Sequence, residues 1–273
     1  MKIVVCFKAI TDYGRLSKED WVWDEHYSIE MSFVRRIFNC FDESALEIAL
    51  KLSKLSDSVG LPSKLTALTI DDQKGDLFLK HLCAVGYDAV RIQPELEIDL
   101  RFNPIAVSHL IAAYVKQAGQ QLVLLGQQGG DGDNRQTGLL VAERLGWPCI
   151  RGVTEIVITE SKNHLTITSQ SDGHTLVQTV KLPMVSIIGQ SVDSPYLRIP
   201  TLKQKLAVKK KEIKVLSIGD LDIKGNLTDN NDKSLIQFLH PHKKPACLFI
   251  EGENPREQAQ ILYNQYLKER LVK

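Results

Sequence analysis

The chain has 273 residues, of which 43% are hydrophobic and 25% charged, and these proportions are ordinary for a folded globular protein. Its 34 lysines and arginines nearly balance its 33 aspartates and glutamates, so the net charge of +1 gives no overall field that would favour nucleic acid or an anionic membrane surface. No apolar run approaches the roughly 20 residues that a membrane-spanning helix needs, and we expect no membrane insertion.

The cysteines indicate a reducing compartment. All five are widely spaced, no CxxC pair exists, and four of them lie among apolar residues. An odd number without a regular framework is typical of an intracellular protein that has no disulfides. The N-terminus, MKIVVCFKAI, has too short an apolar stretch for a signal peptide and fits a first buried strand better. We therefore expect a cytoplasmic protein.

The first half of the chain alternates between strand and helix patterns. Apolar runs rich in β-branched residues predict buried strands at residues 2–8, 64–70, 87–92 and 121–125. Helical spacing of apolar residues predicts helices at 45–55, 72–85, 103–118 and 135–145. Residues 21–38 alternate loosely and are interpreted as an exposed hairpin. Strands alternating with helices predict an α/β fold: a doubly wound, mostly parallel sheet with helices on both faces.

After Pro148 the pattern changes to shorter strands separated by turns. An antiparallel β-meander appended to the core is predicted from strands at 152–158, 164–170 and 175–180. Residues 182–189 return as a buried strand, and 190–211 form a long surface segment. Residues 219–245 are rich in Gly, Asn, Asp, Lys and Pro and are interpreted as an exposed linker. One more strand and a last helix follow in residues 246–273.

One polar stretch lies where a predicted strand meets a predicted helix: Gly126–Leu140, GQQGGDGDNRQTGLL. In open parallel sheets, ligands bind beyond the carboxyl ends of the strands, which is where this stretch lies. Glycines allow main-chain amides to approach an anion closely, and the following helix directs its positive end toward the anion. The residues that fit such a phosphate site are Gly129, Gly130, Gly132 and Gly138, with hydrogen-bond donors at Asn134, Gln136 and Thr137.

The same stretch permits a plainer interpretation. Its spacing matches neither G-x-G-x-x-G nor a Walker A loop. Asp131 and Asp133 would repel a phosphate unless they bind ribose hydroxyls, cap the helix or hold a metal ion. A flexible strand-to-helix loop with Asp133 as the helix cap explains the residues equally well, so the spacing alone leaves both interpretations open.

Several stretches, taken together, carry a resemblance to a known family. They are MKIVVCFKAITDY, FNCFDESALEIALKL, LVLLGQQGGDGDNRQTGLLVAERLGWP, VKLPMVSI and SPYLRIPTLKQKLAVKKKEIKVL, in this order. Over roughly residues 1–218 they resemble the β subunit of electron transfer flavoproteins, including the bacterial FixA-like branch. The last strand and helix resemble the C-terminal arm of that subunit. Each stretch alone is weak, but the combination is specific.

The resemblance implies a core related to adenine-nucleotide α-hydrolases and a heterodimer with an α subunit that holds most of the redox-active FAD. In that family the β subunit binds AMP, or a second FAD in electron-bifurcating members, and carries electrons without being an enzyme itself. The resemblance divides the chain into a nucleotide-binding domain at 1–218, a linker at 219–245 and an arm at 246–273 that packs on the α subunit. The family's loop pattern, GKQ-x-x-D-x-D-x-x-Q-x-G, has Gln127 here instead of the lysine and is matched at Gln128, Asp131, Asp133, Gln136 and Gly138.

Further cofactor contacts are implied by the resemblance. The expected nucleotide contacts outside the matched pattern are Ala9, Asn39, Cys40, Phe41, Asp42, Thr66, Leu68, Thr69, Gly126 and Arg135. Cys40 replaces the proline of the family's N-P-F-[CD] turn. Tyr13 resembles a tyrosine that approaches the isoalloxazine of the α-bound FAD, and the alternative is an exposed loop tyrosine.

The surface segment 190–211 resembles the recognition loop that docks a partner dehydrogenase, of the acyl-CoA type or another flavin type. Leu202 matches the leucine that anchors there, and Tyr196 lies in Asp193–Leu197, which replaces the family's N-E-P-R-Y. The alternative is a surface loop whose leucine packs on its own domain. The lysine run at 209–211 is interpreted as a solvated face and not as a nucleic-acid site, and we expect no metal site.

Three functions therefore stay open. The first is the electron carrier subunit, which binds AMP or a second FAD and forms one wall of the α-bound FAD site. The second is a nucleotide hydrolase or adenylyl transferase of the same fold, which needs a cluster of groups that stabilise phosphate charge. For that cluster the sequence offers Arg135 but no P-loop lysine and no evident base. The third is a flavin-free module that binds an adenine nucleotide.

Overall fold

The computed structural model describes residues 1–22, 30–72, 75–94, 100, 103–159, 163–189, 191, 193–223 and 247–271. The chain forms two compact units, Met1–Ser234 and Leu235–Lys273. None of the helices in the described ranges combines the length and the apolar character that crossing a membrane requires.

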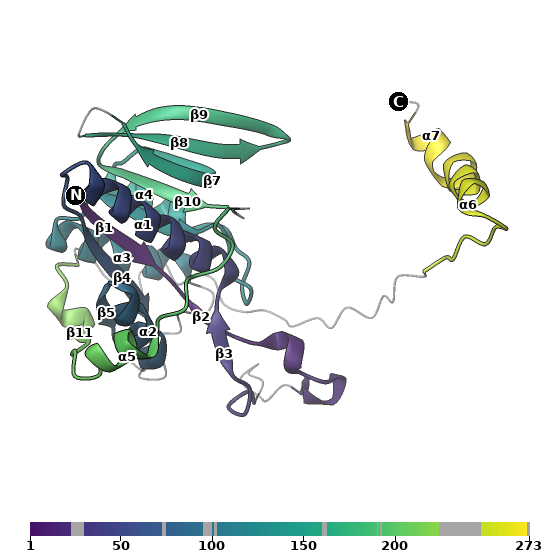
Figure 1. Ribbon diagram of the computed structural model, residues 1–273. Helices are drawn as coiled ribbons and strands as arrows, with labels where there is room; N and C mark the ends of the chain where they lie inside the picture. Colours follow the sequence, from purple (N-terminus) through teal and green to yellow (C-terminus); the bar gives the residue numbers. More distant parts are fainter. Residues whose placement is uncertain are drawn as a thin grey trace. The chain divides into compact units, whose positions relative to one another are not determined.

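A nine-stranded sheet organises the first unit (Figure 1). Its strands are β1 (Lys2–Cys6), β4 (Lys64–Ile70), β5 (Asp88–Ile92), β6 (Leu122–Gly126), β7 (Cys149–Ile158), β8 (His164–Ser171), β9 (His174–Lys181), β10 (Met184–Ile188) and β11 (Lys214–Leu216). They lie in the order β11-β5-β4-β1-β6-β10-β7-β8-β9. Neighbours from β11 to β7 are parallel, whereas β8 is antiparallel to β7 and to β9. The predicted α/β fold with a mostly parallel sheet is confirmed, and the meander continues that sheet through β7.

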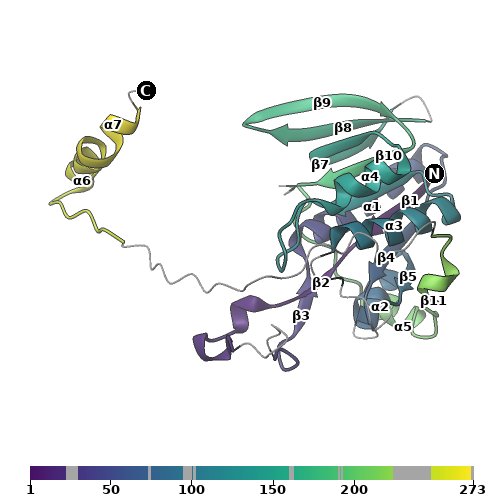
Figure 2. The same ribbon diagram turned by 180° about the vertical axis from the view of Figure 1, so that it is seen from behind.

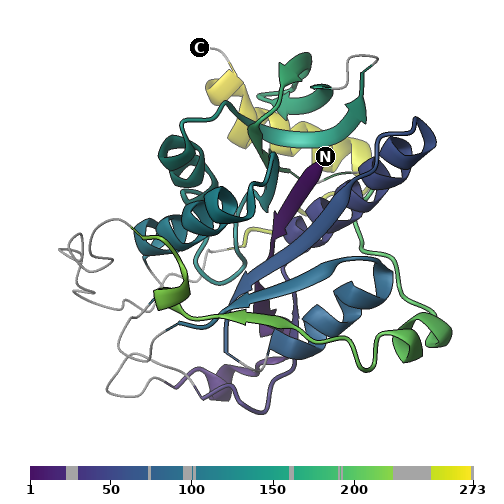
Figure 3. The ribbon, with the colours of Figure 1, turned by 90° about the vertical axis from the view of Figure 1, so that its left-hand side faces the viewer.

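Helices cover both faces of the parallel strands. They are α1 (Cys40–Ser58), α2 (Asp76–Val85), α3 (Pro104–Ala118) and α4 (Thr137–Leu145). Successive side chains of a strand point to opposite faces, so Ile3 and Val5 join the core beneath α1 and α2, and Val4 and Cys6 join the core beneath α3 and α4. Figure 2 shows α3 and α4 on the near side of the sheet, and Figure 3 shows the two pairs of helices on opposite sides. This layering explains why the strand sequences are almost continuously apolar.

Local sequence sets where the helices begin and end. Asn103 caps α3, with its Oδ1 accepting a hydrogen bond from Ala106 N at 2.9 Å, and Pro104 occupies the first helical position. Gly119 ends α3 with a φ of 62°, and Gly86 ends α2 with a φ of 116°. Both glycines adopt the left-handed conformation that other residues avoid. The predicted start of α3 and the predicted ends of both helices are therefore confirmed.

The predicted hairpin within residues 21–38 is not what the described residues form. β3 (Arg36–Phe38) pairs antiparallel with β2 (Ala9–Thr11), which directly follows β1. Short 3-10 turns follow at Tyr13–Arg15 and Lys18–Asp20, and residues 23–29 lie outside the description. The strand partner is distant in sequence, so a local alternation of residues does not identify it.

The surface segment 190–211 contains a helix that the sequence analysis missed. α5 (Leu202–Ala207) begins with a reciprocal capping box, in which Gln204 N donates to Thr201 Oγ1 at 3.3 Å and Thr201 N donates to Gln204 Oε1 at 2.8 Å. β11 and a 3-10 turn at Ile218–Asp220 follow. β11 was also missed, because three residues are too few for a periodic signal.

The second unit is helical in its described C-terminal part. α6 (Pro255–Leu262) follows Asn254, whose Oδ1 accepts from Glu257 N at 3.0 Å, and the helix continues through a π-helical stretch at Tyr263–Leu267 and α7 (Lys268–Leu271). Residues 247–250, where we expect a strand, form none, because no neighbouring strand pairs with them in the described part of the chain. No residue described in this unit is buried. Most of the expected linker lies outside the described residues.

Candidate functional site

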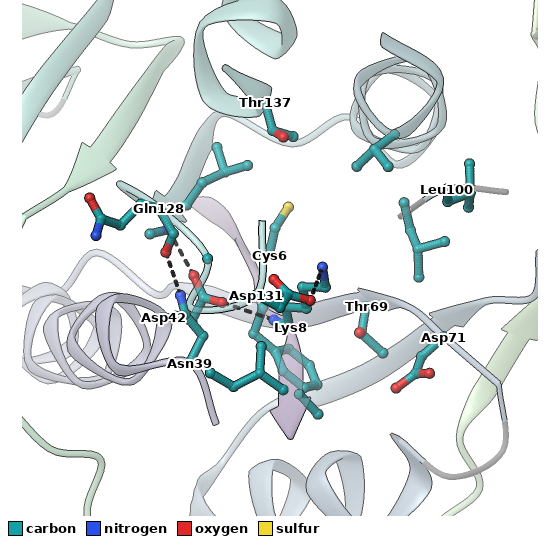
Figure 4. A pocket seen from close by; sticks show the side chains of 18 of the residues that line it. Cys6, Lys8, Asn39, Asp42, Thr69, Asp71, Leu100, Gln128, Asp131 and Thr137 are labelled. Atoms are coloured by element: carbon teal, nitrogen blue, oxygen red, sulfur yellow. Dashed lines mark hydrogen bonds and ion pairs between the residues drawn. The ribbon is translucent and has the colours of Figure 1, made fainter. Parts of the chain in front are cut away.

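A cleft of about 850 Å³ opens at the carboxyl ends of β1, β4 and β6 (Figure 4). β4 leads into α2 on one face of the sheet and β6 leads into α4 on the other, so the strand order reverses beside β1. Open α/β sheets bind ligands at such a switch point. The cleft is bounded by the strand ends, the start of α3 and residues 126–138, which we call the glycine loop.

The glycine loop is bent at residues other than its glycines. Asp133 and Arg135 have φ values of 42° and 55°, a conformation that is costly for residues with a Cβ and that clusters at functional sites. Asp133 N donates to Gly129 O at 3.0 Å, and Gln136 N donates to Asn134 Oδ1 at 3.0 Å. Successive residues of alternating hand are the backbone arrangement from which anion-binding concavities are built.

The glycines of this loop instead permit close packing. A Cβ at Gly130 would lie 2.8 Å from Ile10 Cδ1, and a Cβ at Gly138 would lie 2.7 Å from Ile187 Cγ1. Gly138 therefore allows the first turn of α4 to rest against β10. The N-cap residue of α4 is Gln136, whose side chain makes no capping hydrogen bond. The interpretation of Asp133 as the helix cap is therefore wrong.

The two aspartates of the loop each have a cationic partner. Lys8 Nζ lies 2.5 Å from Asp131 Oδ2, and Arg135 Nε lies 3.3 Å from Asp133 Oδ1. The first pair is partly shielded, because the Asp131 side chain is only 24% exposed. The objection that these carboxylates would repel a phosphate is therefore answered by ion pairs within the chain, without a metal ion.

Asp42 ties the ends of two strands together beneath the cleft. Its Oδ2 accepts from Lys8 N at 2.9 Å, just after β1, and its Oδ1 accepts from Gly126 N at 3.0 Å, at the end of β6. A Cβ at Gly126 would lie 2.2 Å from Asp42 Oδ1, so this approach requires glycine. Burial raises the pKa of Asp42 to about 7, although its hydrogen bonds oppose the shift. The carboxyl is thus already engaged by the main chain, and it acts as a support for the cleft.

Asn39 connects α1 to the glycine loop. Its Nδ2 donates to Gln128 O at 2.8 Å, which fixes the first residues of the loop. Its Oδ1 is buried and has no hydrogen-bond partner among the described residues, and Asn39 lines the cleft. A buried acceptor without a partner is costly, and a ligand donor can satisfy it.

The opposite rim of the cleft carries a second set of polar and aromatic groups. Arg36 Nη2 lies 2.7 Å from Asp71 Oδ2 and donates to Ala9 O at 2.7 Å. Tyr13 lines the cleft and stacks on Trp21, with ring centroids 6.0 Å apart and planes inclined by 21°. Burial, followed by the negative charge of Asp131, raises the pKa of the Tyr13 hydroxyl. An aromatic ring is therefore held at the rim, close enough to Asp131 to be affected by its charge.

Most of the predicted cofactor-binding residues line this cleft. They are Ala9, Tyr13, Asn39, Asp42, Leu68, Thr69, Gly126, Gln128, Gly129, Asp131, Asn134, Arg135, Gln136, Thr137 and Gly138. Cys40, Phe41, Gly130, Gly132 and Asp133 belong to the same segments but do not line it. The lining set therefore favours the strand ends and the two ends of the loop over its middle.

Thr66 was expected to contact the nucleotide but does not line the cleft. It lies near the amino end of β4 and lines a separate hollow of about 310 Å³, where Gln120 Nε2 donates to Thr66 Oγ1 at 3.5 Å. Only residues at the carboxyl end of β4, such as Thr69, reach the cleft. The strand was predicted, but the position along it was misjudged.

Sequence reasoning missed several residues that line the cleft. Cys6, Lys8, Arg36 and Asp71 all belong to this group. Lys8 and Asp71 lie within two residues of the carboxyl ends of β1 and β4, so the rule that ligands bind beyond strand ends could have identified them. Arg36 has no comparable signal, because its strand β3 reaches the cleft only through its pairing with β2.

The predicted partner-binding residues lie outside the cleft. Leu202, at the start of α5, is 72% exposed, and Tyr196 is 75% exposed. The alternative in which Leu202 packs on its own domain is therefore wrong. Among the described residues, no group of three or more His, Cys, Asp and Glu side chains could hold a metal ion.

Comparison with known proteins places this fold and cleft in a family. The family model described as the electron transfer flavoprotein domain matches residues 29–221. The chain is 27% identical over 273 residues to "Putative electron transfer flavoprotein subunit YgcR" of Escherichia coli (strain K12), which covers 99% of both chains. It is 30% identical over 229 residues to electron transfer flavoprotein subunit beta of Bacillus subtilis (strain 168), covering 83% of this chain and 84% of the relative. It is 27% identical over 253 residues to the human protein of that name, covering 92% and 93%. The chain belongs to the electron transfer flavoprotein family and resembles its β subunits.

Proposed function

We propose that the chain is the β subunit of an electron transfer flavoprotein and that its cleft binds an adenine nucleotide, either AMP or a second FAD. The observation that carries the proposal is the glycine loop, which bends through two left-handed residues, holds two ion-paired aspartates and leads into the start of α4. Helix N-termini and such amide clusters are established anion sites. A phosphate is the anion that an adenine nucleotide brings.

The remaining walls of the cleft suit the adenosine part. Leu68, Pro104, Val107 and Ile111 line it with apolar surface against which a planar base can be buried. Asn39 Oδ1 offers an acceptor to an amino or hydroxyl donor. The volume of about 850 Å³ lies within the range of about 300–1,000 Å³ that is usual for small-molecule sites. These features support adenylate binding and apply equally to AMP and to the adenylate half of FAD.

The flavin that carries the electrons would be shared with an α-type subunit. We propose that Tyr13, held by Trp21 at the rim, faces the isoalloxazine of that FAD. The flavin supplies the redox chemistry, and this chain supplies position and charge. The chain is then an electron carrier subunit and not an enzyme. Consistent with this role, Asp131 and Asp133 are held in ion pairs and Asp42 is held by main-chain amides.

Two exposed regions are proposed to bind partner proteins. Leu202 and Tyr196 would meet a flavin dehydrogenase, because the segment before α5 is fixed: Lys51 Nζ donates to Asp193 O at 2.8 Å, and Arg198 Nε donates to Glu47 Oε2 at 3.0 Å. Residues 246–273, reached through a linker at 219–245, would pack on the α-type subunit. The absence of any buried residue among those described in the second unit supports a partner there.

Co-expression with an α-type subunit tests the proposal. The purified pair should show flavin absorbance and release an adenine nucleotide that mass spectrometry identifies as AMP or FAD. A pair that carries neither would contradict the proposal. Turnover of ATP by the chain alone would instead support the hydrolase or transferase.

The partner surface needs a separate variant. Leu202→Ala should leave the bound nucleotide unchanged and slow electron delivery from the dehydrogenase by about tenfold, as expected for the loss of a central apolar anchor. Loss of nucleotide in this variant would contradict the separation of the two surfaces.

A further inference from the structure

We propose that Lys8 is a positioning residue of the anion site: its ammonium neutralises Asp131, so that the glycine loop presents amides and not a negative charge to a phosphate. The inference rests on the proposed function, since the anion concerned is the phosphate of the adenine nucleotide. It gives an anion-binding role to a residue that lies outside the loop and reaches it from the end of β1.

The main chain of Lys8 is fixed from both sides by the start of α1. Lys8 N donates to Asp42 Oδ2 at 2.9 Å, and Asn39 N donates to Lys8 O at 3.0 Å. Asp42 also accepts from Gly126 N, so the same carboxyl orients Lys8 and the first residue of the loop. Figure 4 shows the Lys8 side chain directed toward Asp131. The main chain that carries the ammonium is therefore fixed beside the start of the loop.

The loop is shaped to bring Asp131 to this ammonium. Lys8 Nζ and Asp131 Oδ2 are 2.5 Å apart. Gly129 leaves the space that the carboxylate occupies, because a Cβ there would lie 3.0 Å from Asp131 Oδ1. The Asp131 carboxylate thus folds back over its own loop, toward β1.

The other cations that line the cleft have partners of their own. Arg36 lies 2.7 Å from Asp71 and donates to Ala9 O, and Arg135 lies 3.3 Å from Asp133. Of the lining residues that the structure describes, Lys8 is the cation paired with Asp131. Gln127, the first loop residue after β6, carries no charge that could replace it.

This pairing predicts effects of opposite sign for its two members. Without Lys8, the Asp131 charge faces the phosphate, and repulsion in a partly screened site weakens AMP binding by about tenfold. Without the Asp131 charge, the Lys8 ammonium is left unpaired beside the phosphate, and binding strengthens by about threefold. Neutralising both members removes both charge effects, and the main-chain amides of the glycine loop then bind the phosphate alone.

The test uses the full chain co-purified with its α-type subunit and freed of nucleotide, with AMP as the titrant in calorimetry. The variants are Lys8→Met, Asp131→Asn and the double variant, and Lys8→Arg is the conservative substitution. Lys64→Met is the matched control, because Lys64 pairs with Asp88 at the other end of the sheet, 3.2 Å away. Thermal unfolding of each nucleotide-free variant is measured alongside.

Support would be about a tenfold loss in Lys8→Met, affinity within about threefold of the parent in the double variant and in Lys8→Arg, and no change in Lys64→Met. Failure of the double variant to recover would overturn the inference in favour of direct contact between Lys8 and the phosphate. If Lys8→Met instead lowers the unfolding temperature and Asp131→Asn does not restore AMP binding, its role is structural and the inference also falls. A parent pair that binds no AMP and no FAD would overturn the proposed function itself, a result distinct from these.

Discussion

The two edges of the parallel sheet carry similar charges but use them differently. At the carboxyl edge, Lys8 lies 2.5 Å from Asp131 beside a cleft of about 850 Å³. At the amino edge, Lys64 and Lys211 lie 3.2 Å and 2.9 Å from Asp88 beside a hollow of about 310 Å³. Lysine–aspartate pairs are thus present at both edges and do not by themselves mark a site.

The difference lies in the main-chain groups around these pairs. At the carboxyl edge, the buried Asp42 accepts from the main-chain amides of two strand ends, and the glycine loop bends beside the cleft through two left-handed residues. At the amino edge, lysines donate to main-chain carbonyls: Lys2 Nζ to Ala118 O at 3.1 Å and Lys211 Nζ to Tyr87 O at 3.0 Å. The arrangement of main-chain donors at the carboxyl edge, and not the number of charged residues, therefore distinguishes the candidate site.

The largest effect should come from disturbing the carboxyl edge at Gly126. In Gly126→Ala, the new Cβ would lie 2.2 Å from Asp42 Oδ1 and 2.8 Å from Phe41 Cβ. Either the strand end or the carboxyl must move, which breaks a buried hydrogen bond. We expect a loss of about 3 kcal/mol in the free energy of unfolding, measured by urea titration, together with loss of the bound nucleotide.

Gly14→Ala is the matched control for this change. A Cβ at Gly14 would lie 3.7 Å from Asp12 Oδ1, an ordinary contact. Its stability should change by less than about 1 kcal/mol. Equal losses in the two variants would show that the contact between Gly126 and Asp42 does not support the cleft.

A smaller, pH-dependent effect should come from Asp42→Asn. The pKa of Asp42 is raised from 3.8 to about 7, so the folded state binds this proton more tightly than the unfolded state. Stability of the parent should therefore fall as pH rises from about 4 to about 7, by linkage. The asparagine has no such proton, and its NH₂ faces one of the two amides that the carboxyl accepts. We expect the variant to be about 2 kcal/mol less stable at about pH 5, with a smaller difference near pH 8.

Urea titrations across this pH range measure the effect of Asp42. Asp57→Asn, at an exposed position of the same helix, is the control. If the parent and Asp42→Asn lose stability in parallel as pH rises, another group is responsible for the slope, and the support that Asp42 gives to the strand ends is independent of its charge.

The fold could be predicted because its signals are local. The apolar runs of β1 and β4, the spacing of α1 and the caps of α3 each lie within one segment, and each element appeared where predicted. The pairing of β2 with β3 depends on contacts between distant residues, and α5 and β11 are too short for a periodic pattern. The sequence therefore did not predict which distant strands pair or where the shortest elements lie.

For the candidate site, too, the sequence predicted the local features and not the contacts between segments. The glycine loop could be found from its composition and its place after β6. The cations that pair with its aspartates could not be found in this way, because the path of the loop in space determines that Lys8 and Arg135 are the partners. Thr66 was assigned to the site from the family resemblance, but only the last residues of a strand reach the carboxyl edge. A sequence thus indicates which segment binds and leaves the charge balance within it to the structure.

The smallest effect should come from the amino edge, in Asp88→Asn. The Lys211 hydrogen bond, with a further contribution from Lys64, lowers the pKa of the Asp88 carboxyl. A group with a lowered pKa stabilises the fold above its ordinary pKa, and this contribution is lost as pH falls through the folded value. Because the Asp88 side chain is 46% exposed, solvent and salt screen its ion pairs, and we expect a loss of less than about 1 kcal/mol near pH 7.

The nucleotide content of Asp88→Asn tests whether the charges of the amino edge affect binding in the cleft. The variant should retain as much AMP or FAD as the parent, because Lys211 still donates to Tyr87 O and no residue of the glycine loop at the other edge changes. The small stability loss should also shrink at high salt, as it does for exposed ion pairs. If the variant instead released its nucleotide, the charges of the amino edge would be coupled to the cleft through β4 and β5, and main-chain donors alone would no longer account for the site.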